Sequence, residues 1–245
     1  MRLGVLLAAA AALEAACRAG WIDGMTMIPP SEMALAMMRM LASGKVTGDI
    51  LYTLRNALAA IFLSVGLGFA LGAAIHALPR LRRVLDPLLA SYYAVPIFVF
   101  YPLLIVVFGI NDVPLIVIGT MFGIVAMIVN TLAGLDRIPR ALIKSARLLG
   151  LSRFEELLFV SLPSAGPYLI TGVKFSIVYS IIAIVAGEFI LSSRGLGFRI
   201  AFAYNDFDNR TMYGLMLLLL TAVTVVILSL HGWEKRLHGR WGRHW

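Results

Sequence analysis

The chain has 245 residues, of which 60% are hydrophobic and 14% are charged, and its formal net charge is +8. Soluble domains carry roughly 25% charged residues, so this composition excludes an ordinary soluble domain. Uncharged runs such as 88–110, 113–135 and 212–230 reach the roughly 18 to 25 residues that cross a hydrocarbon core. The sequence therefore predicts an integral membrane protein built from α-helices.

Six membrane spans are predicted within a single all-α domain, residues 1–245. They cover about residues 2–20, 53–78, 87–110, 113–135, 167–191 and 211–231. Most Lys and Arg residues outside the spans fall on the side of both termini and of the loop 136–166. Because the side richer in Lys and Arg faces the cytoplasm, both termini and this loop are predicted to be cytoplasmic. Charges spread over short membrane loops disfavour nucleic-acid binding.

The first span is interrupted by Glu14 and Arg18, which stand four residues apart on one helical face and can form an ion pair. A signal peptide is the competing interpretation, because one Arg precedes an Ala/Leu run. Cys17 raises the further idea of a lipoprotein signal, but Glu14 stands where such a signal carries an apolar residue. An uncleaved span is the favoured interpretation.

The third span contains two prolines six residues apart, Pro96 and Pro102. Each proline frees a backbone carbonyl at mid-depth, which is tolerated where neighbouring helices or a water-lined cavity satisfy it. Tyr92, Phe98 and Tyr101 cluster around this break. Two interpretations stay open, namely a translocation path and ordinary aromatic packing around a proline kink.

Two charged residues lie inside the predicted fifth span, and such residues are costly and often functional. Lys174 lies in the cytoplasmic half, where it either snorkels or contacts carbonyls of a neighbouring helix. Glu188 lies near the external end, where it serves as a gate, locks two helices together or reaches the interface. The tail 233–245 interleaves Trp with Arg and His, which indicates anchoring in the lipid headgroup layer.

The loop 136–166 is a charged island between two long apolar spans. Arg137, Arg140, Lys144 and Arg147 recur at spacings of three, four and three, which places them on one helical face. Gly150 stands where a helix C-cap is expected. Ser152 and Glu155 then form a predicted capping box, and the second helix is expected to run to about Ser161 and stop before Pro163. Two short amphipathic helices indicate either a docking element or a basic loop on anionic lipid.

The sequence shows no catalytic machinery. It contains no Gly-rich phosphate-binding loop followed by Lys and Ser or Thr, and no Gly-x-Ser-x-Gly nucleophile elbow. The four His residues make no metal-ligand spacing within a helix. We therefore predict no catalytic residue, no metal site and no cofactor bound by this chain.

A resemblance to a known family becomes specific in the loop. Residues 144–150 followed by Val160-Ser161-Leu162-Pro163 resemble the EAA loop of ABC importer permeases, whose pattern is Glu-Ala-Ala, three residues, Gly, nine residues and Ile-x-Leu-Pro. Lys144 stands where the family has Glu and Ser145 where it has Ala. Further segments look like landmarks of the permeases of nitrate, sulfonate, taurine and bicarbonate importers and of their relatives for pyrimidine precursors and aromatic acids: 29–32, 86–89, 130–135, 193–197 and 212–214.

The resemblance implies a type I ABC importer permease fold in a bacterial inner membrane, working by alternating access. Two permease subunits, expected to be a homodimer, would pair around a central path. Separate ATP-binding cassette subunits would bind ATP and magnesium and receive the coupling helices of the loop, and a periplasmic binding protein would deliver the solute.

The resemblance also assigns roles to residues. The residues expected to couple to the ATPase are Arg140, Lys144, Ser145, Ala146, Arg147, Gly150, Leu162 and Pro163. The residues expected, from position alone, to line or gate the path are Tyr92, Pro96, Phe98, Tyr101, Pro102 and Glu188. The competing function is a membrane scaffold that anchors a cytoplasmic partner through the basic loop. An exporter permease is disfavoured because the loop resembles those of importers.

Overall fold

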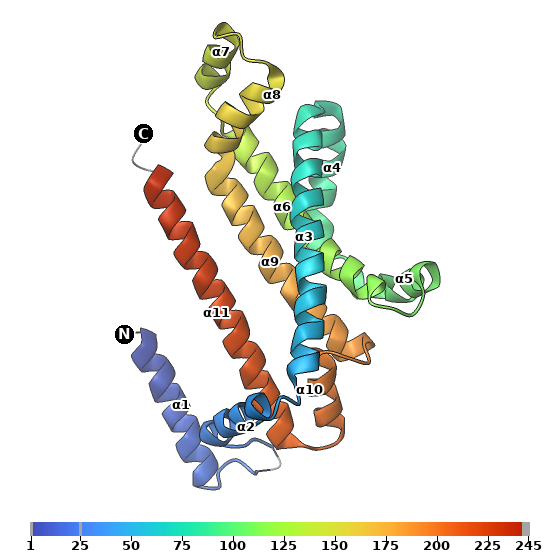
Figure 1. Cartoon of the computed structure of the whole chain (residues 1–245), viewed down its shortest axis with the longest axis vertical. Coiled ribbons are helices and arrows are strands. Elements are labelled where there is room, and N and C mark those ends of the chain that lie inside the picture. The colour runs from blue at the N-terminus through green and yellow to red at the C-terminus, as the bar shows by residue number, and fades with distance from the viewer. Residues whose placement is uncertain (1, 25, 242–245) are drawn as a thin grey trace. The chain divides into compact units, whose positions relative to one another are not determined.

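The computed structural model describes residues 2–24 and 26–241, without the side chains of residues 2, 3, 6, 153 and 236–241. The described residues contain no β-strand. In chain order the α-helices (Figure 1) are α1 (Arg2–Arg18), α2 (Pro30–Ser43), α3 (Thr47–Ala77), α4 (Pro79–Ser91), α5 (Tyr101–Phe108), α6 (Val113–Asp136), α7 (Arg140–Leu148), α8 (Arg153–Glu156), α9 (Leu162–Leu191), α10 (Leu196–Asn205) and α11 (Asn209–Trp241). Short 3₁₀ segments cover Tyr92–Ala94 and Ile97–Phe100, and a π-helical segment covers Leu157–Ser161.

Four helical stretches of the described residues are long and apolar enough to cross a membrane. They are Thr47–Ala77, Val113–Asp136, Phe154–Asn205 and Asn209–Lys235, and a fifth is added if the bent pair Pro79–Ala94 and Ile97–Phe108 forms one broken span. The predicted all-α polytopic class is therefore confirmed. The described helices do not reach the count of six spans, because α1 has only 17 residues and the third predicted span is broken.

The break in the third predicted span, 87–110, has a local cause. The helix pair on either side is bent by 93°. Val95 is extended, with φ −78° and ψ 125°, because the ring of Pro96 disfavours the helical conformation of the residue before it. The break that the two prolines of this span predict is therefore present, since Pro96 ends one helix and a new one begins beyond it.

The chain forms two compact units. The first comprises residues 1–55 and 185–228, and the second comprises residues 56–184 and 229–245. Three long helices, α3, α9 and α11, each contribute residues to both units.

The first unit has its core where α10 and α11 pack on the start of α3. Its buried apolar residues are Val46, Leu196, Ile200, Ala203, Met212 and Leu215. Gly214 lets α2 approach α11 closely, because a Cβ there would lie 2.5 Å from Met40 Cε and 3.0 Å from Ala36 Cβ. At the start of the unit Glu14 forms the predicted ion pair with Arg18, at 2.6 Å. Its carboxylate also accepts hydrogen bonds from the backbone N–H and hydroxyl of Ser31, at 3.0 and 2.7 Å, which tie α1 to α2.

The second unit is built on close contacts between α3, α6 and α9. A Cβ on Gly68 of α3 would lie 2.6 Å from Met127 Cβ, and one on Gly123 of α6 would lie 2.8 Å from Ser64 Oγ. The hydroxyls of Ser176 and Ser180 on α9 donate to the carbonyls of Gly123 and Gly119, at 2.9 and 3.0 Å. Small residues and buried hydroxyls are the usual means by which membrane helices pack tightly.

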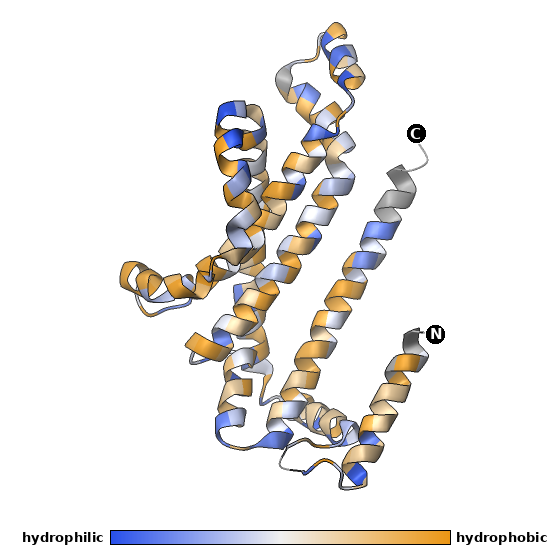
Figure 2. Ribbon diagram, turned by 180° about the vertical axis from the view of Figure 1, so that it is seen from behind, coloured by the Kyte–Doolittle hydropathy of each residue, from blue (hydrophilic) through white to orange (hydrophobic). Residues whose placement is uncertain are grey.

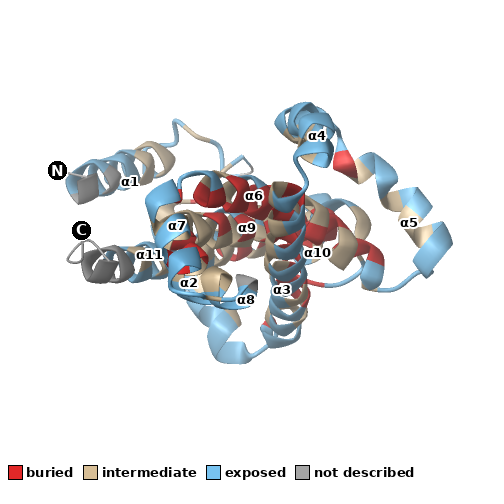
Figure 3. Cartoon of the chain, turned by 90° about the horizontal axis from the view of Figure 1, so that it is seen from above, coloured by how far each residue is buried: buried red, intermediate tan, exposed pale blue. Residues whose placement is uncertain are grey.

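Burial follows this arrangement. Buried residues gather on α6 and α9 (Figure 3), and 61% of the apolar window of α6 is buried compared with 11% for α11. Hydrophobic residues colour much of α5 and α11, whereas hydrophilic residues gather on α7 and on the start of α4 (Figure 2). The most buried of the four candidate spans is therefore α6, whereas most of the apolar window of α11 is left accessible to lipid or another protein chain.

The contact at Gly123 predicts a stability difference between two glycines. Gly123→Ala places a methyl group against Ser64 and Ser180, and we expect it to lower stability by about 1–3 kcal/mol because the contact has no room. Gly66→Ala on α3 is the matched control, because nothing lies within 4 Å of a Cβ there. Thermal unfolding in detergent measures both. Equal midpoints for the two variants would contradict the packing described here.

Candidate functional site

The loop between α6 and α9 folds into an elbow, defined here as residues 137–161. Its first helix, α7, ends in a Schellman motif. Gly150 adopts φ 76°, and the N–H groups of Gly150 and Leu151 donate to the carbonyls of Arg147 and Ala146 at 3.1 Å each. This left-handed conformation is open to glycine and strained for most other residues. The predicted C-cap at Gly150 is therefore present.

The second part of the elbow starts as predicted but does not end as predicted. Ser152 N–H donates to the Glu155 carboxylate at 2.7 Å, and Glu155 N–H donates to Ser152 Oγ at 3.3 Å, which is a reciprocal capping box. After Glu156 the chain continues through the π segment directly into α9. The predicted stop before Pro163 is wrong, because the π segment carries the helix onward past this proline.

The elbow exposes both charged and apolar side chains. Arg140, Lys144, Ser145 and Arg147 are exposed, and Arg147 Nε lies 3.3 Å from the carboxylate of Glu156. The exposed apolar side chains form a second set: Leu148 is 89% exposed and Leu149 is 80% exposed, and Phe154 and Phe159 are also exposed. Sequence reasoning missed this apolar surface, although Leu148 and Leu149 directly precede the glycine that turns the chain.

The remaining residues expected to couple to an ATPase differ in accessibility. Ala146 is only 3% exposed, so it packs within the chain and supports the elbow instead of offering a side chain to a partner. Leu162 is half-buried at the start of α9, and Pro163 is exposed. The assignment of these eight residues to ATPase contact stays a prediction.

A cluster of charges anchors the elbow where it leaves α6. Arg82 of α4 donates two hydrogen bonds to the Asp136 carboxylate, both 2.6 Å long. His76 Nδ1 at the end of α3 lies 3.2 Å from the same carboxylate. The next residue, Arg137, donates to the hydroxyl of Tyr168 on α9. The ends of α3, α4 and α6 are thereby held together. No local pattern in the sequence signals this cluster, because its partners lie far apart along the chain.

The aromatic segment around the broken span packs against α6. The Tyr92 hydroxyl donates to the carbonyl of Met121 at 3.0 Å, and the rings of Phe98 and Phe122 lie 5.5 Å apart. Tyr92, Phe98 and Tyr101 surround a buried cluster of Ile97, Ile118 and Ala183, whereas Pro96 and Pro102 are exposed. This geometry fits the packing interpretation, and lining of a path by these residues stays a prediction.

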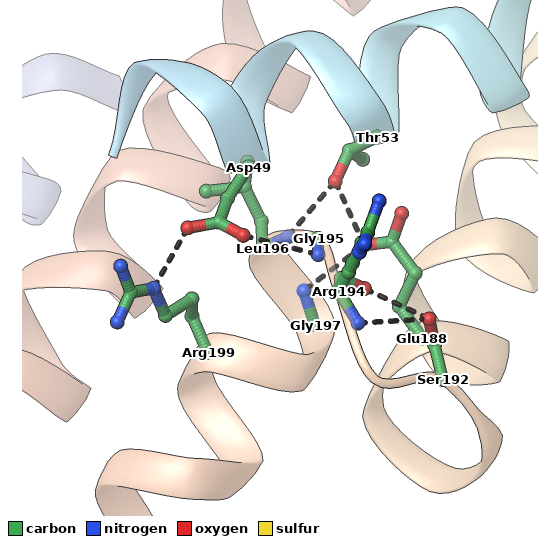
Figure 4. Close-up of polar contacts among 9 residues, drawn as sticks. All are labelled: Asp49, Thr53, Glu188, Ser192, Arg194, Gly195, Leu196, Gly197 and Arg199. Carbon is green, nitrogen blue, oxygen red and sulfur yellow. Dashed lines mark hydrogen bonds and ion pairs between the residues drawn. The ribbon is translucent and has the colours of Figure 1, made fainter. Parts of the chain in front are cut away.

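Glu188 is fully buried in the first unit, 0% exposed, where the turn 192–197 closes over it (Figure 4). Its Oε2 accepts hydrogen bonds from Thr53 Oγ1 at 2.8 Å and from Gly197 N–H at 3.1 Å. Its Oε1 has no hydrogen-bond partner among the described residues. The carboxylate therefore joins α3, α9 and the start of α10, which fits the predicted lock, and a role of Glu188 as a gate or path-lining residue stays a prediction.

Lys174 pairs with an acid of the same unit. Its Nζ lies 2.9 Å from the Glu234 carboxylate, in the second unit, and His231 Nδ1 lies 3.4 Å from the same oxygen. An ion pair at this position satisfies a cation within the span. Both interpretations of Lys174 from the sequence, snorkelling and carbonyl contact, missed this acid, which lies 60 residues away.

Within the described residues no group of three or more His, Cys, Asp or Glu side chains is placed to hold a metal ion.

The comparison with known families decides the assignment. The model of the binding-protein-dependent transport system inner membrane component matches residues 64–243. The chain belongs to this family. It is therefore an ABC transporter permease, a transport component of the membrane, as the motif in the elbow predicted.

Three relatives show how much of this chain is similar to known permeases. The taurine transport system permease protein TauC of Escherichia coli (strain K12) is 35% identical over 150 residues, which are 60% of this chain and 54% of that protein. The nitrate import permease protein NrtB of Leptolyngbya laminosa is 34% identical over 168 residues, 66% of this chain and 60% of that protein. A probable ABC transporter permease protein of Brucella melitensis biotype 1 is 27% identical over 216 residues, 86% of this chain and 85% of that protein. The permease thus matches little more than half the length of the taurine relative.

Solved structures show the same fold. An inward-facing conformation of the MetNI methionine ABC transporter matches with a TM-score of 0.62 at 18% identity and covers 79% of this chain and 98% of that one. A second crystal form of that transporter gives a TM-score of 0.60 at 20% identity, with 75% and 94% covered. The type I importer fold predicted from the sequence is confirmed.

The Arg82–Asp136 pair is predicted to contribute modestly to stability, and the effects of changing its two side chains are predicted to be coupled. Because both side chains are partly exposed, we expect Arg82→Gln and Asp136→Asn each to cost about 0.5–1 kcal/mol. The double variant should cost no more than the larger single change, since the pair is already lost. Thermal unfolding of the purified permease measures this cycle.

Arg80→Gln is the matched control, because Arg80 is an exposed arginine on the same helix. A double variant whose cost equals the sum of the two single costs would show that the two side chains do not interact.

Proposed function

We propose that this permease is the membrane-spanning subunit of an ATP-driven, binding-protein-dependent importer of a small solute. The observation that supports the proposal most directly is the elbow, a structured surface of exposed cations and exposed leucines held rigidly between α6 and α9. Apolar side chains that protrude from a short helix are costly in water and indicate a protein partner. Lipid contact alone would not require the cap, the capping box and the charge cluster that fix the elbow.

The partner that this surface would receive is a separate ATP-binding cassette subunit, which binds ATP and magnesium. Leu148 and Leu149 would enter its surface groove, and Arg140, Lys144 and Arg147 would meet acidic groups around the groove. ATP binding would bring two such ATPases together and pull the two elbows of a permease dimer with them. A second copy of this chain is the simplest partner for that dimer.

The solute would cross by alternating access. Closure of the ATPases favours one of two permease states, and hydrolysis restores the other, so the energy of ATP sets the balance between them. A periplasmic binding protein would deliver the solute to the external loops, with both termini of the permease in the cytoplasm. The relatives named for taurine and nitrate support a small solute such as a sulfonate, nitrate or another small organic molecule.

Co-purification with an ATPase tests the proposal. The permease is co-expressed with a candidate ATP-binding cassette subunit, and the ATPase retained per permease is measured. We expect Leu149→Gln to reduce retention by about tenfold, because a central apolar contact is lost. Gly150→Trp should do the same by adding bulk to the elbow.

Two matched controls separate contact from misfolding. Gly150→Asn keeps a residue that tolerates the left-handed conformation and should retain the ATPase. Arg80→Gln changes an exposed residue outside the elbow and should also retain it. Failure of wild type to retain any ATPase would contradict the transporter and favour a membrane scaffold. Full retention by Leu149→Gln and Gly150→Trp would show that the elbow is not the contact.

A further inference from the structure

The start of α10 is capped in an unusual way. Its N-cap is Gly195, which has no side chain and adopts φ 98°. The first N–H groups of a helix have no partner within the helix, so they need acceptors from elsewhere. Here three successive N–H groups find acceptors on other helices (Figure 4). Gly195 donates to Asp49 Oδ1 at 3.2 Å.

The two following N–H groups complete the pattern. Leu196 N–H donates to Thr53 Oγ1 at 2.9 Å, and Gly197 N–H donates to Glu188 Oε2 at 3.1 Å. Thr53 in turn donates its own proton to that same Glu188 oxygen, at 2.8 Å. Two carboxylates and one hydroxyl from α3 and α9 therefore hold the end of α10, where the helix dipole also favours negative charge.

The glycines of the turn are required by this contact. A Cβ on Gly195 would collide with the carboxyl group of Glu188. A Cβ on Gly197 would lie 2.7 Å from Glu188 Cβ and would also collide with the carbonyl of Val185. The backbone of the turn therefore lies directly against Glu188, and there is no room for a side chain at either glycine.

The position of α10 fixes a cavity of about 200 Å³ in the first unit. Its rim carries charges of both signs, Lys45 and Arg199 against Asp206 and Asp208, over apolar residues that include Val46 and Leu215. Arg199 is held by Asp49, the residue that also accepts from Gly195, with Nε 2.7 Å from Oδ2. Asp49 thus places both the start of α10 and one wall of the cavity.

We propose that Glu188 is a positioning residue, which latches α10 through Thr53 and Gly197 and so presents a preformed mixed-charge surface to the periplasmic binding protein. This role rests on the proposed function, because it places α10 on the external side. It removes Glu188 from the solute path. The latch consists of the two hydrogen bonds that Oε2 accepts, so any variant that keeps an acceptor oxygen there should keep the latch.

Local proteolysis tests the latch without any partner. Arg194 is exposed in the turn, so trypsin cleaves after it when the turn opens, and mass spectrometry of the purified permease measures the rate at this bond. We expect Thr53→Val and Glu188→Met to raise that rate about tenfold or more, because both remove hydrogen bonds while filling similar space. Thr53→Ser and Glu188→Gln keep the required oxygen and should stay within about threefold of wild type.

Several outcomes overturn the latch. Equal cleavage rates at Arg194 for Thr53→Val and wild type would do so, and so would a Glu188→Gln variant that opens as readily as the Glu188→Met variant. If Glu188→Met fails to fold, the Thr53 pair decides alone. The control Ser192→Ala removes two hydrogen bonds within the turn, one that Ser192 Oγ donates to the Arg194 carbonyl at 2.9 Å and one that it accepts from the Arg194 N–H at 3.2 Å. It leaves the bonds to Glu188 in place and should raise the rate less than Thr53→Val does.

A functional readout tests the positioning role. In vesicles that hold the permease with the ATPase that it retains and are supplied with a candidate periplasmic binding protein, Thr53→Val should keep basal ATP hydrolysis and lose about fivefold or more of the stimulation by the binding protein. Equal loss of basal and stimulated rates would overturn the positioning role, as would full stimulation. If wild type assembles with no ATPase, the proposed function fails, and the cleavage experiment still reports on the latch.

Discussion

Within a membrane the backbone must satisfy its own polar groups, and no hydrophobic effect draws one helix to another. Helix contact in the second unit therefore depends on small residues. Gly68 and Gly123 let α3, α6 and α9 approach closely, and the hydroxyls of Ser176 and Ser180 donate to carbonyls of α6. The aromatic segment and the elbow are attached to this core, because the aromatic segment packs on α6 and the elbow runs from the end of α6 to the start of α9.

The same constraint explains where the charged residues are found. Lys174 is paired with Glu234, and Glu188 uses one oxygen for two hydrogen bonds. Neither residue is left facing hydrocarbon. Burying a carboxylate with one unpaired oxygen is expensive, and a helix N-terminus that lacks its own capping side chain is expensive as well. In the first unit the two needs partly meet, because Glu188 Oε2 accepts a hydrogen bond from the N–H of Gly197 at the start of α10.

Local signals in the sequence were predictive where both partners of an interaction stand within a few residues. The cap at Gly150 and the box of Ser152 and Glu155 are of this kind, as is the ion pair of Glu14 and Arg18. Prediction failed at Pro163, where a π segment carried the helix onward. Pairs such as Thr53 with Glu188, which stand 135 residues apart, could not be predicted from the sequence, because the residue types alone do not say which helices become neighbours.

The π segment Leu157–Ser161 has a consequence for chain length. A single π turn within a helix accommodates one residue more than the α-helical ladder around it would hold. The side chains of the elbow and of α9 therefore point in the same relative directions as they would in an uninterrupted α-helix that is one residue shorter. Loss of a single residue from this segment would leave an ordinary α-helix with the same faces, whereas loss of a residue within α9 would rotate every later side chain by about 100° about the helix axis.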